Sequence, residues 1–451
     1  MRPAAAVAIC LLVPAGVAVS QPATSSAPAT APATRPAAAL YLTDADITFL
    51  REQIAANRDP WADEFRRLAE RLEPLRRKGL LFASVRTPDL PTARLPLFRS
   101  VGVLRPRDLR GAEAPLGQLA ELLTDGRLAR DLALHYRLAG PAAEADAAAA
   151  VKILRTWPQA VADRVVDQRI ARDIAGGLPA MLYAAELLRV YRGCDAARRE
   201  PFEKWAVALA EGVRMQEKIH AGYLSKPRGL YQATWARHLA LAAGTLFGRS
   251  ELADWAVRGD PQRRSPIGPM LAWAFDDAKD AEGLAEGRPL RTRRLDETAF
   301  ALQPLLLMGM ILRNRAAADP LSPLGLDAKG RAWAGLRRIG RFLCNDIHWP
   351  GAGAQMPRDS RGRAELPIVF GEATLFVPLT AAAGGEPSDR MRALAHRVLR
   401  HNPRARPRQG GGLDDRARIE PWVLGPVFLT HYRRPLPASR PAATQPATGP
   451  R

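Results

Sequence analysis

The amino-acid sequence predicts an all-α protein. Apolar residues recur at helical spacing along most of the chain, strand signals are scarce, and Gly or Pro stands at most breaks between apolar runs. The best β-branched run, residues 368–370, is too short to seed a sheet. Roughly a dozen helices joined by short loops indicate a helical bundle, a solenoid or an α/α toroid. We find no fixed-period repeat, which argues against tetratricopeptide-like arrays.

The individual helices follow from caps and apolar stripes. Thr43 and Asp46 have the spacing of a capping box, which predicts a helix that continues through Ile54. A second helix is expected to begin at Pro60, because proline is favoured in the first helical turn. Further amphipathic runs predict helices over residues 116–139, 142–157, 165–191, 196–220, 230–248, 251–258, 265–279, 297–314, 327–345, 369–383 and 388–402.

The start of the chain is typical of a secretory signal. Arg2 supplies a basic start, Val7 to Val13 form a compact apolar stretch, and Ala18-Val19-Ser20 provides small residues for cleavage. This segment is too short to span a membrane, and no later segment is apolar for long enough. We therefore expect a periplasmic or secreted protein without a membrane span.

Composition divides the rest of the chain. Residues 21–39 and 437–451 are rich in Pro, Ala and Thr, and such segments cannot bury enough apolar surface to stay ordered. We expect a signal peptide over 1–20, disordered segments over 21–39 and 437–451, and one folded domain over 40–436. That domain holds Cys194 and Cys344, which form either a disulfide or two separate buried thiols.

The charge balance favours a polyanionic partner. The chain has 66 Lys and Arg against 46 Asp and Glu, a formal net charge of +20. Only seven of the basic residues are Lys, so an arginine-rich genome also accounts for part of this balance. No nucleic-acid recognition motif is present, and an exported protein rarely meets nucleic acid. An acidic polysaccharide is therefore the expected partner, and we expect no nucleic acid.

Several familiar catalytic motifs are absent from the sequence. There is no Walker loop, dinucleotide-binding glycine pattern, His-Glu-x-x-His or Gly-x-Ser-x-Gly. The histidines are dispersed, and His396 and His401 are spaced to miss a common helix face. We therefore expect neither a metal site nor a cofactor.

Four segments between residues 202 and 314 carry a family resemblance. They are Trp235 in Leu-Tyr-Gln-Ala-Thr-Trp, Asp254–Val257, the Arg291–Arg294 turn and Phe300–Leu305. Their order and intervals resemble the alginate lyase family, in its periplasmic polymannuronate-lyase branch. That branch has Asn-Asn-His-x-x-Trp at a helix start, then Asp-Trp-Ala-Val, an Arg-rich turn and a catalytic Tyr before a Tyr-Ala-Leu-x-Pro-Leu helix. The resemblance implies a monomeric, incomplete α/α toroid of roughly a dozen helices that acts on a uronate polymer.

The sequence departs from the family where the chemistry lies. Aligned on Trp235, Tyr231 and Gln232 occupy the positions of the family's Asn-His pair. Aligned on residues 300–305, Glu297 takes the place of the catalytic Tyr, and Arg291 falls within one residue of the substrate-binding Arg. The scaffold residues match, whereas the acid–base residues do not.

The candidate residues follow from what β-elimination requires. One group must neutralise the sugar carboxylate, a base must take the C5 proton, and an acid must protonate the leaving oxygen. The resemblance implies the substrate-binding candidates Gln232, Trp235, Arg291 and Arg293. It also leaves three catalytic candidates, which are Tyr231, His238 and Glu297.

Each candidate also has a purely structural interpretation. Trp235 suits helix packing, His238 an ordinary core or solvated histidine, and Tyr231 a partly buried phenol. The arginines at 291 and 293 fit a solvated turn, and Glu297 fits an acid that interacts with a helix dipole.

Two other function classes stay open. Loss of the family's acid–base residues also fits a catalytically inactive protein that binds acidic polysaccharide. A glycoside hydrolase on the same toroid would need two carboxylates at a set separation. Its candidates are Asp276, Asp277, Glu286, Asp296 and Glu297.

Overall fold

The described part of the protein is mostly helical. The computed structural model describes residues 39–77, 117–161, 168–219, 229–259, 267–275, 295–315, 320–327 and 330–343. These ranges contain eleven α-helices and no β-strand. The predicted all-α class is therefore confirmed.

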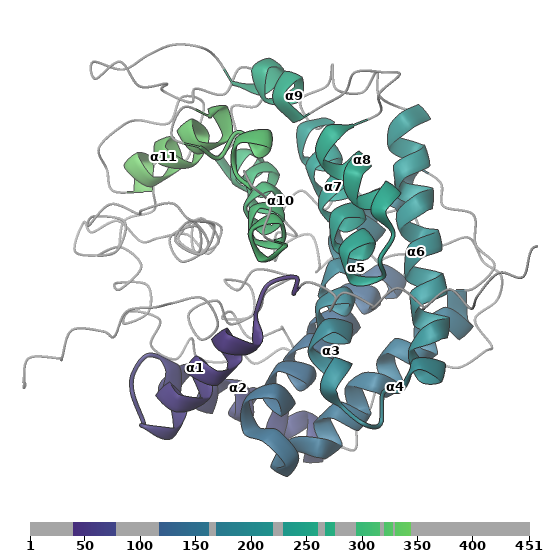
Figure 1. Cartoon of the computed structure of the whole chain (residues 1–451), viewed down its shortest axis with the longest axis vertical. Coiled ribbons are helices and arrows are strands. Elements are labelled where there is room, and N and C mark those ends of the chain that lie inside the picture. Colours follow the sequence, from purple (N-terminus) through teal and green to yellow (C-terminus); the bar gives the residue numbers. More distant parts are fainter. Residues whose placement is uncertain are drawn as a thin grey trace, which may run out of the picture. The chain divides into compact units, whose positions relative to one another are not determined.

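The helices lie close to the ranges that periodicity predicts (Figure 1). They are α1 (Asp44–Ala55), α2 (Trp61–Arg77), α3 (Gly117–Ala139), α4 (Glu144–Val161), α5 (Gln168–Leu187), α6 (Ala196–Ile219), α7 (Gly229–Leu246), α8 (Ser250–Arg258), α9 (Ile267–Ala274), α10 (Leu295–Asn314) and α11 (Arg331–Leu343). The helices predicted over 369–383 and 388–402 lie outside the described residues.

The predicted capping box at the start of α1 is present. Asp46 N donates to Thr43 Oγ1 at 3.2 Å, and Thr43 N donates to Asp46 Oδ2 at 2.8 Å. These reciprocal bonds satisfy backbone donors that no preceding helical turn can pair. The cap thus sets the point at which the chain turns into α1.

Helix α4 continues past the point at which the sequence predicts its end. Pro158 favours a stop after Trp157, yet the helix extends to Val161. The Trp157 indole donates from Nε1 to Asp125 Oδ2 of α3 at 3.1 Å, and the side chain is buried. We infer that this anchor offsets the backbone bond that a proline removes, a tertiary effect invisible to local propensity.

The helices form two layers of the α/α toroid type. Short connections join α3 to α4, α5 to α6 and α7 to α8, so each pair forms a helical hairpin. Helices α3, α5, α7 and α10 pack against one another in succession, and we call them the inner row. Helix α4 packs against α6 outside that row. This alternation of inner and outer helices is the expected incomplete α/α toroid.

Helix α7 lies at the centre of the core. Residues 233–246 are all buried, because α5, α6, α8 and α10 contact this helix. A helix that is apolar on all sides is typical of such a position, and Ala and Leu dominate this stretch. Its small residues let neighbouring helices approach closely.

Two further sequence expectations concern cysteine and membranes. Cys194 is a buried free thiol, which agrees with separate thiols, and Cys344 lies outside the described residues. No helix among the described residues has both the length and the apolar character needed to cross a bilayer.

A substitution at Gly244 can test how closely α7 packs on α8. A Cβ at this position would lie 2.7 Å from Ala253 N and 2.8 Å from Arg249 O, both backbone atoms that cannot move aside cheaply. We expect Gly244→Ala to lower the free energy of unfolding by about 1–3 kcal/mol, measured by urea denaturation.

Gly268 provides the matched control, because a Cβ on this helical glycine meets no atom within 4 Å. Gly268→Ala should leave the unfolding free energy unchanged or raise it by up to ~1 kcal/mol. Equal effects of the two substitutions would contradict the packing of α8 on α7.

Candidate functional site

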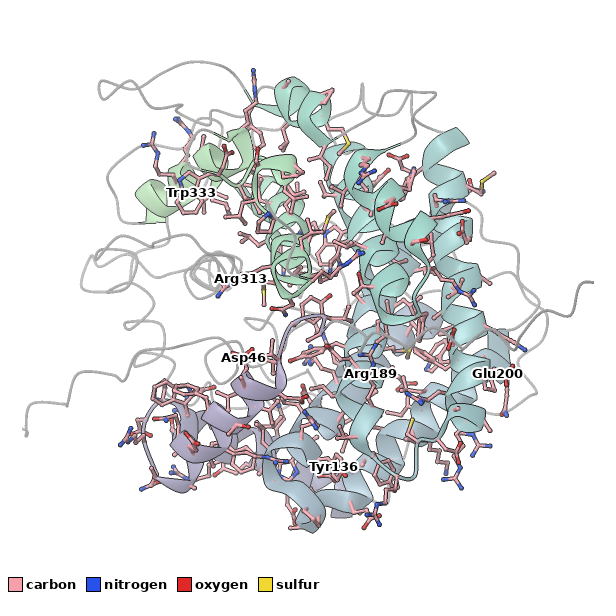
Figure 2. All side chains as sticks on the ribbon, in the orientation of Figure 1. Asp46, Tyr136, Arg189, Glu200, Arg313 and Trp333 are labelled. Carbon is pink, nitrogen blue, oxygen red and sulfur yellow. The ribbon has the colours of Figure 1, made fainter. Side chains whose placement is uncertain are left out.

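The inner helices run in the same direction, and two contacts between helix ends show this. Arg315 Nη1, just after α10, lies 3.4 Å from Thr245 Oγ1 near the end of α7. Arg189, which follows α5 (Figure 2), donates from Nη2 to Leu246 O at 3.0 Å. The carboxyl ends of α5, α7 and α10 therefore meet, and we call this the carboxyl end of the inner row.

The amino ends of these helices must then share the opposite side. At a rise of about 1.5 Å per residue, Tyr231 lies roughly 21 Å along α7 from Thr245, and Glu297 roughly 27 Å along α10 from Arg315. Both candidates stand in the first turn of their helix. The packing of α7 on α10 thus brings their backbones to one side, which we call the amino end.

The other predicted site residues divide by location. Gln232 is half-buried in the first turns of α7, beside Tyr231. The side chains of Tyr231 and Glu297 are not among those described, and Arg291 and Arg293 lie outside the described residues. In sequence, the two arginines directly precede α10.

Trp235 and His238 lie inside the protein. Trp235 is 2% exposed, and its indole meets the His238 ring edge-on, with ring centroids 5.6 Å apart and planes at 83°. His238 is fully buried, and its Nε2 lies 2.7 Å from Tyr41 Oη. Their burial favours the packing interpretation of both, while their predicted contact with a substrate stays a prediction.

The amino end favours anions for a physical reason. Each α-helix carries a partial positive charge at its amino terminus, where the first backbone N–H groups have no partner within the helix. Parallel packing places several such termini on one side of the protein. Basic residues that directly precede α10 add to this bias in the sequence.

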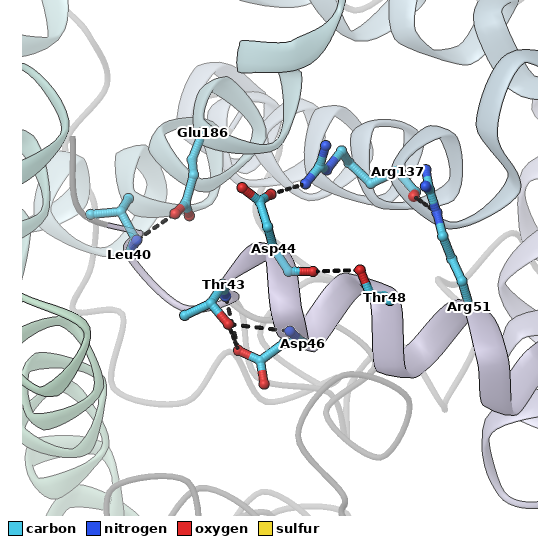
Figure 3. Close-up of polar contacts among 8 residues, drawn as sticks. All are labelled: Leu40, Thr43, Asp44, Asp46, Thr48, Arg51, Arg137 and Glu186. Carbon is cyan, nitrogen blue, oxygen red and sulfur yellow. Dashed lines mark hydrogen bonds and ion pairs between the residues drawn. The ribbon is translucent and has the colours of Figure 1, made fainter. Parts of the chain in front are cut away.

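The segment that precedes α1 is attached to the helices at the carboxyl end. We call residues Leu40–Thr43 the strap. Leu40 N donates to Glu186 Oε1 of α5 (Figure 3), and Leu40 O accepts from Asn314 Nδ2 of α10 at 3.2 Å. Tyr41 contacts His238 of α7, as described above. The strap is therefore bonded to three of the four inner helices.

Contacts around α1 add the fourth inner helix. Arg137, near the end of α3, donates from Nη2 to Asp44 Oδ1 at 2.7 Å (Figure 3). The carbonyl of Arg137 also accepts from Arg51 Nε of α1 at 2.9 Å. The residues that follow the strap thus extend its anchorage to α3.

A buried polar cluster lies beneath the strap and consists of Tyr41, Tyr183, Glu186 and His238. The Tyr41 and Tyr183 rings meet edge-on, with centroids 4.9 Å apart. Among the described residues, Tyr183 Oη, Glu186 Oε2 and His238 Nδ1 are buried without a hydrogen-bond partner. Such unpartnered groups are rare in protein interiors and call for an explanation.

Burial keeps this cluster uncharged near neutral pH. It raises the pKa of Glu186 from 4.5 to about 8, although the backbone N–H of Leu40 works in the opposite direction. Burial also lowers the pKa of His238 to about 3, so its imidazole is neutral. The pKa values of the two tyrosines rise because of burial and, secondarily, because of Glu186.

Sequence reasoning missed Tyr41, Tyr183 and Glu186. None belongs to a recognised motif, and Tyr41 is separated from His238 by 197 residues. One local signal was available: Glu186 is a single acid in the otherwise apolar stretch 178–188, where an ionised side chain is costly.

A second buried polar residue organises the helices around α7. Arg237 is fully buried and lies over the Trp255 ring at 5.0 Å from the centroid. Its Nη1 donates to the carbonyls of Trp255 and Ala256 at 3.3 and 3.2 Å, and its Nη2 lies 3.7 Å from Glu217. Arg237 thereby ties the carboxyl end of α8 and the last turn of α6 to α7.

Acidic and histidine side chains elsewhere form structural pairs. His135 Nδ1 lies 2.7 Å from Asp146 Oδ2, and the His135 ring stacks on Phe65. Within the described ranges, no three His, Cys, Asp or Glu side chains come together as ligands for a metal ion.

Parallel inner helices wrapped by outer helices define a protein of the α/α toroid class. The family model described as alginate lyase matches residues 86–319, just over half of the 451 residues. The chain therefore belongs to the alginate lyase family. The matched region contains all seven candidate residues that the sequence predicts.

A solved structure is also similar to this chain. It is the crystal structure of an alginate lyase from Bacteroides ovatus at 1.60 Å resolution, with 16% sequence identity and a TM-score of 0.48. The alignment covers 80% of this chain and 98% of that chain. No curated protein matches the sequence significantly.

The buried cluster predicts a defined pH dependence of stability. Glu186 has a raised pKa in the folded state, so its contribution is complete below 4.5 and is lost as pH rises towards about 8. His238 has a lowered pKa, so its contribution is complete above 6.5 and is lost as pH falls towards about 3. We expect these two groups to give maximal stability between about pH 4.5 and 6.5.

Urea denaturation between acidic and alkaline pH checks this expectation. Glu186→Gln should remove most of the decrease in unfolding free energy on the alkaline side, since glutamine does not ionise. Glu200→Gln, a surface control beside Lys204, should leave the alkaline slope as in the wild type. A wild-type unfolding free energy that stays constant from pH 4.5 to 8 would contradict the assignment.

Proposed function

We propose that the protein is an exported polysaccharide lyase that cleaves an acidic uronate polymer by β-elimination at the amino end of the inner row. The observation that carries the proposal is the parallel packing of α7 and α10, which places the helix turns of Tyr231, Gln232 and Glu297 on one side. Membership of the alginate lyase family supports the reaction class.

Substrate binding is assigned to the polar and basic residues at this end. Gln232 donates from its side-chain amide, and Arg291 and Arg293 offer guanidinium donors for the sugar carboxylate. Neutralising that carboxylate makes the C5 proton removable, because charge then develops next to hydrogen-bond donors. The amino termini of the parallel helices favour the same anion.

The acid and the base are assigned to the two residues at the substituted positions. The Glu297 carboxylate takes the C5 proton, and the electrons left behind form a double bond between C4 and C5. The C4–O bond then breaks, and the Tyr231 phenol donates its proton to the leaving oxygen. Since Glu297 is itself anionic, the arginines that precede α10 also offset its repulsion of the substrate.

Localisation and chain organisation complete the proposal. A signal peptide over 1–20 would direct export, and the folded body over 40–436 would act as a monomer in the periplasm or outside the cell. The segments 21–39 and 437–451 would serve as disordered flanks.

One observation favours a second candidate function. The chain lacks the Asn-His pair and the Tyr on which its family's chemistry depends. A protein that binds acidic polysaccharide without cleaving it would retain the basic residues and the toroid and lose these groups. Binding and cleavage must therefore be measured separately.

The first test is incubation of the purified protein with alginate and a panel of other polyuronates. β-Elimination should produce ultraviolet absorbance from the new C4=C5 double bond in at least one of them. New reducing ends without this absorbance would indicate a glycoside hydrolase, and no product from any polymer would reject the lyase.

Glu297 can then be tested against a matched acid. Glu297→Gln should lower kcat by at least about 10²-fold and leave polymer affinity unchanged or higher, since it removes a base and a negative charge. Glu251→Gln changes another acid in a first helical turn, that of α8, and should leave kcat unchanged. A comparable loss of kcat in both variants would indicate that Glu297 only stabilises its helix, by interacting with the helix dipole.

The binding function rests on Arg291. Arg291→Ala should weaken polyuronate binding by about tenfold or more at low salt, with a smaller effect at high salt because of screening. Arg258→Ala, at the exposed end of α8, is the control with the same charge change. Unaltered affinity in Arg291→Ala would remove this residue from the site.

A further inference from the structure

We infer that Tyr41 of the strap is a positioning residue, which orients His238 and, through it, the Trp235 indole beneath the amino-end site. The strap would then influence a site at the opposite end of α7. The inference depends on the proposed function for its kinetic consequence, and its structural consequence can be measured independently.

Tyr41 has a fixed position from which to act. Its side chain is 3% exposed, and its ring packs edge-on against Tyr183. The neighbouring backbone is bonded on both sides, since Leu40 N donates to Glu186 and Leu40 O accepts from Asn314. The backbone next to Tyr41 therefore cannot move without breaking contacts to α5 and α10.

The hydrogen bond between Tyr41 and His238 is the polar restraint on the imidazole ring. Tyr41 Oη and His238 Nε2 are 2.7 Å apart, and Nδ1 has no partner among the described residues. An imidazole held by one hydrogen bond has its ring orientation set by that bond, whichever of the two groups donates, because a phenol hydroxyl can both donate and accept. Loss of the phenol hydroxyl would leave both ring nitrogens without a directional contact.

Trp235 transmits this restraint along α7. Its indole meets the His238 ring edge-on, a geometry that depends on the orientation of both rings. Side chains on a helix lean towards its amino terminus, so the indole covers the preceding turn, which contains Tyr231 and Gln232. Residues 231, 235 and 238 also share one helix face by spacing. The rings of His238 and Trp235 thus form a continuous support from the strap towards the site.

The cluster itself supplies a matched pair of variants. Tyr41→Phe keeps the ring and removes a hydroxyl that is bonded to His238. Tyr183→Phe removes a hydroxyl from the same cluster that has no hydrogen-bond partner among the described residues. Both changes delete one buried oxygen, so a difference between them reports the lost hydrogen bond.

The test uses full-length protein labelled with 5-fluorotryptophan, whose Trp235 resonance is identified with Trp235→Phe. Fluorine NMR should show this resonance shifted or broadened in Tyr41→Phe and unchanged in Tyr183→Phe. If Trp235 is unaffected by Tyr41→Phe, or responds equally to both variants, the inference is wrong.

Kinetics separate this inference from the proposed function. If the wild type cleaves a polyuronate, Tyr41→Phe should lower kcat by about tenfold with KM unchanged, because a displaced support misaligns reacting groups. Tyr183→Phe should retain wild-type kcat, and equal kcat values in the two variants would reject the positioning role. If the wild type cleaves nothing, the proposed function fails, while the fluorine NMR result still decides the role of Tyr41.

Discussion

The structure depends on the attachment of the strap to the carboxyl end of the inner row. Leu40 joins Glu186 of α5 to Asn314 of α10 through its two backbone groups, and Tyr41 reaches His238 of α7. Together with the contacts of Arg189 and Arg315, these bonds add direction to helix packing that is mainly apolar and has no directional preference of its own. The parallel alignment of α7 and α10, and hence the amino-end site, relies on this fixed end.

The two ends of the inner row have opposite electrostatic character. At the carboxyl end, burial keeps Glu186 protonated and His238 neutral, so the strap closes over an uncharged cluster. At the amino end, helix termini favour negative charge, and basic residues directly precede α10 in the sequence. Partial negative charge at helix carboxyl termini would repel a polyanion. The proposed placement of the substrate at the amino end therefore agrees with the direction of the helices.

Local pattern predicted the fold well and the candidate site only in part. The Thr43–Asp46 cap and the helix ranges follow from neighbouring residues, and they were found from sequence. Helix α4 passes Pro158 because of Trp157 and Asp125, a tertiary contact that no local rule contains. The Tyr41–His238 bond was missed for the same reason, since 197 residues separate its partners. The sequence identifies Trp235 as part of the family motif. It does not predict that Trp235 is buried, because the helices that cover this residue come from other parts of the chain.

The bond between Leu40 and Asn314 also sets an order of events during folding. These residues are 274 positions apart, so the strap cannot complete its contacts until α10 has been synthesised and packed. The entropic cost of closing so long a loop rises only slowly with loop length. The hydrogen bonds of the strap offset this cost only once the helices that provide its partners have packed. The first of the described segments to be synthesised is therefore secured only after a helix that is made more than 250 residues later.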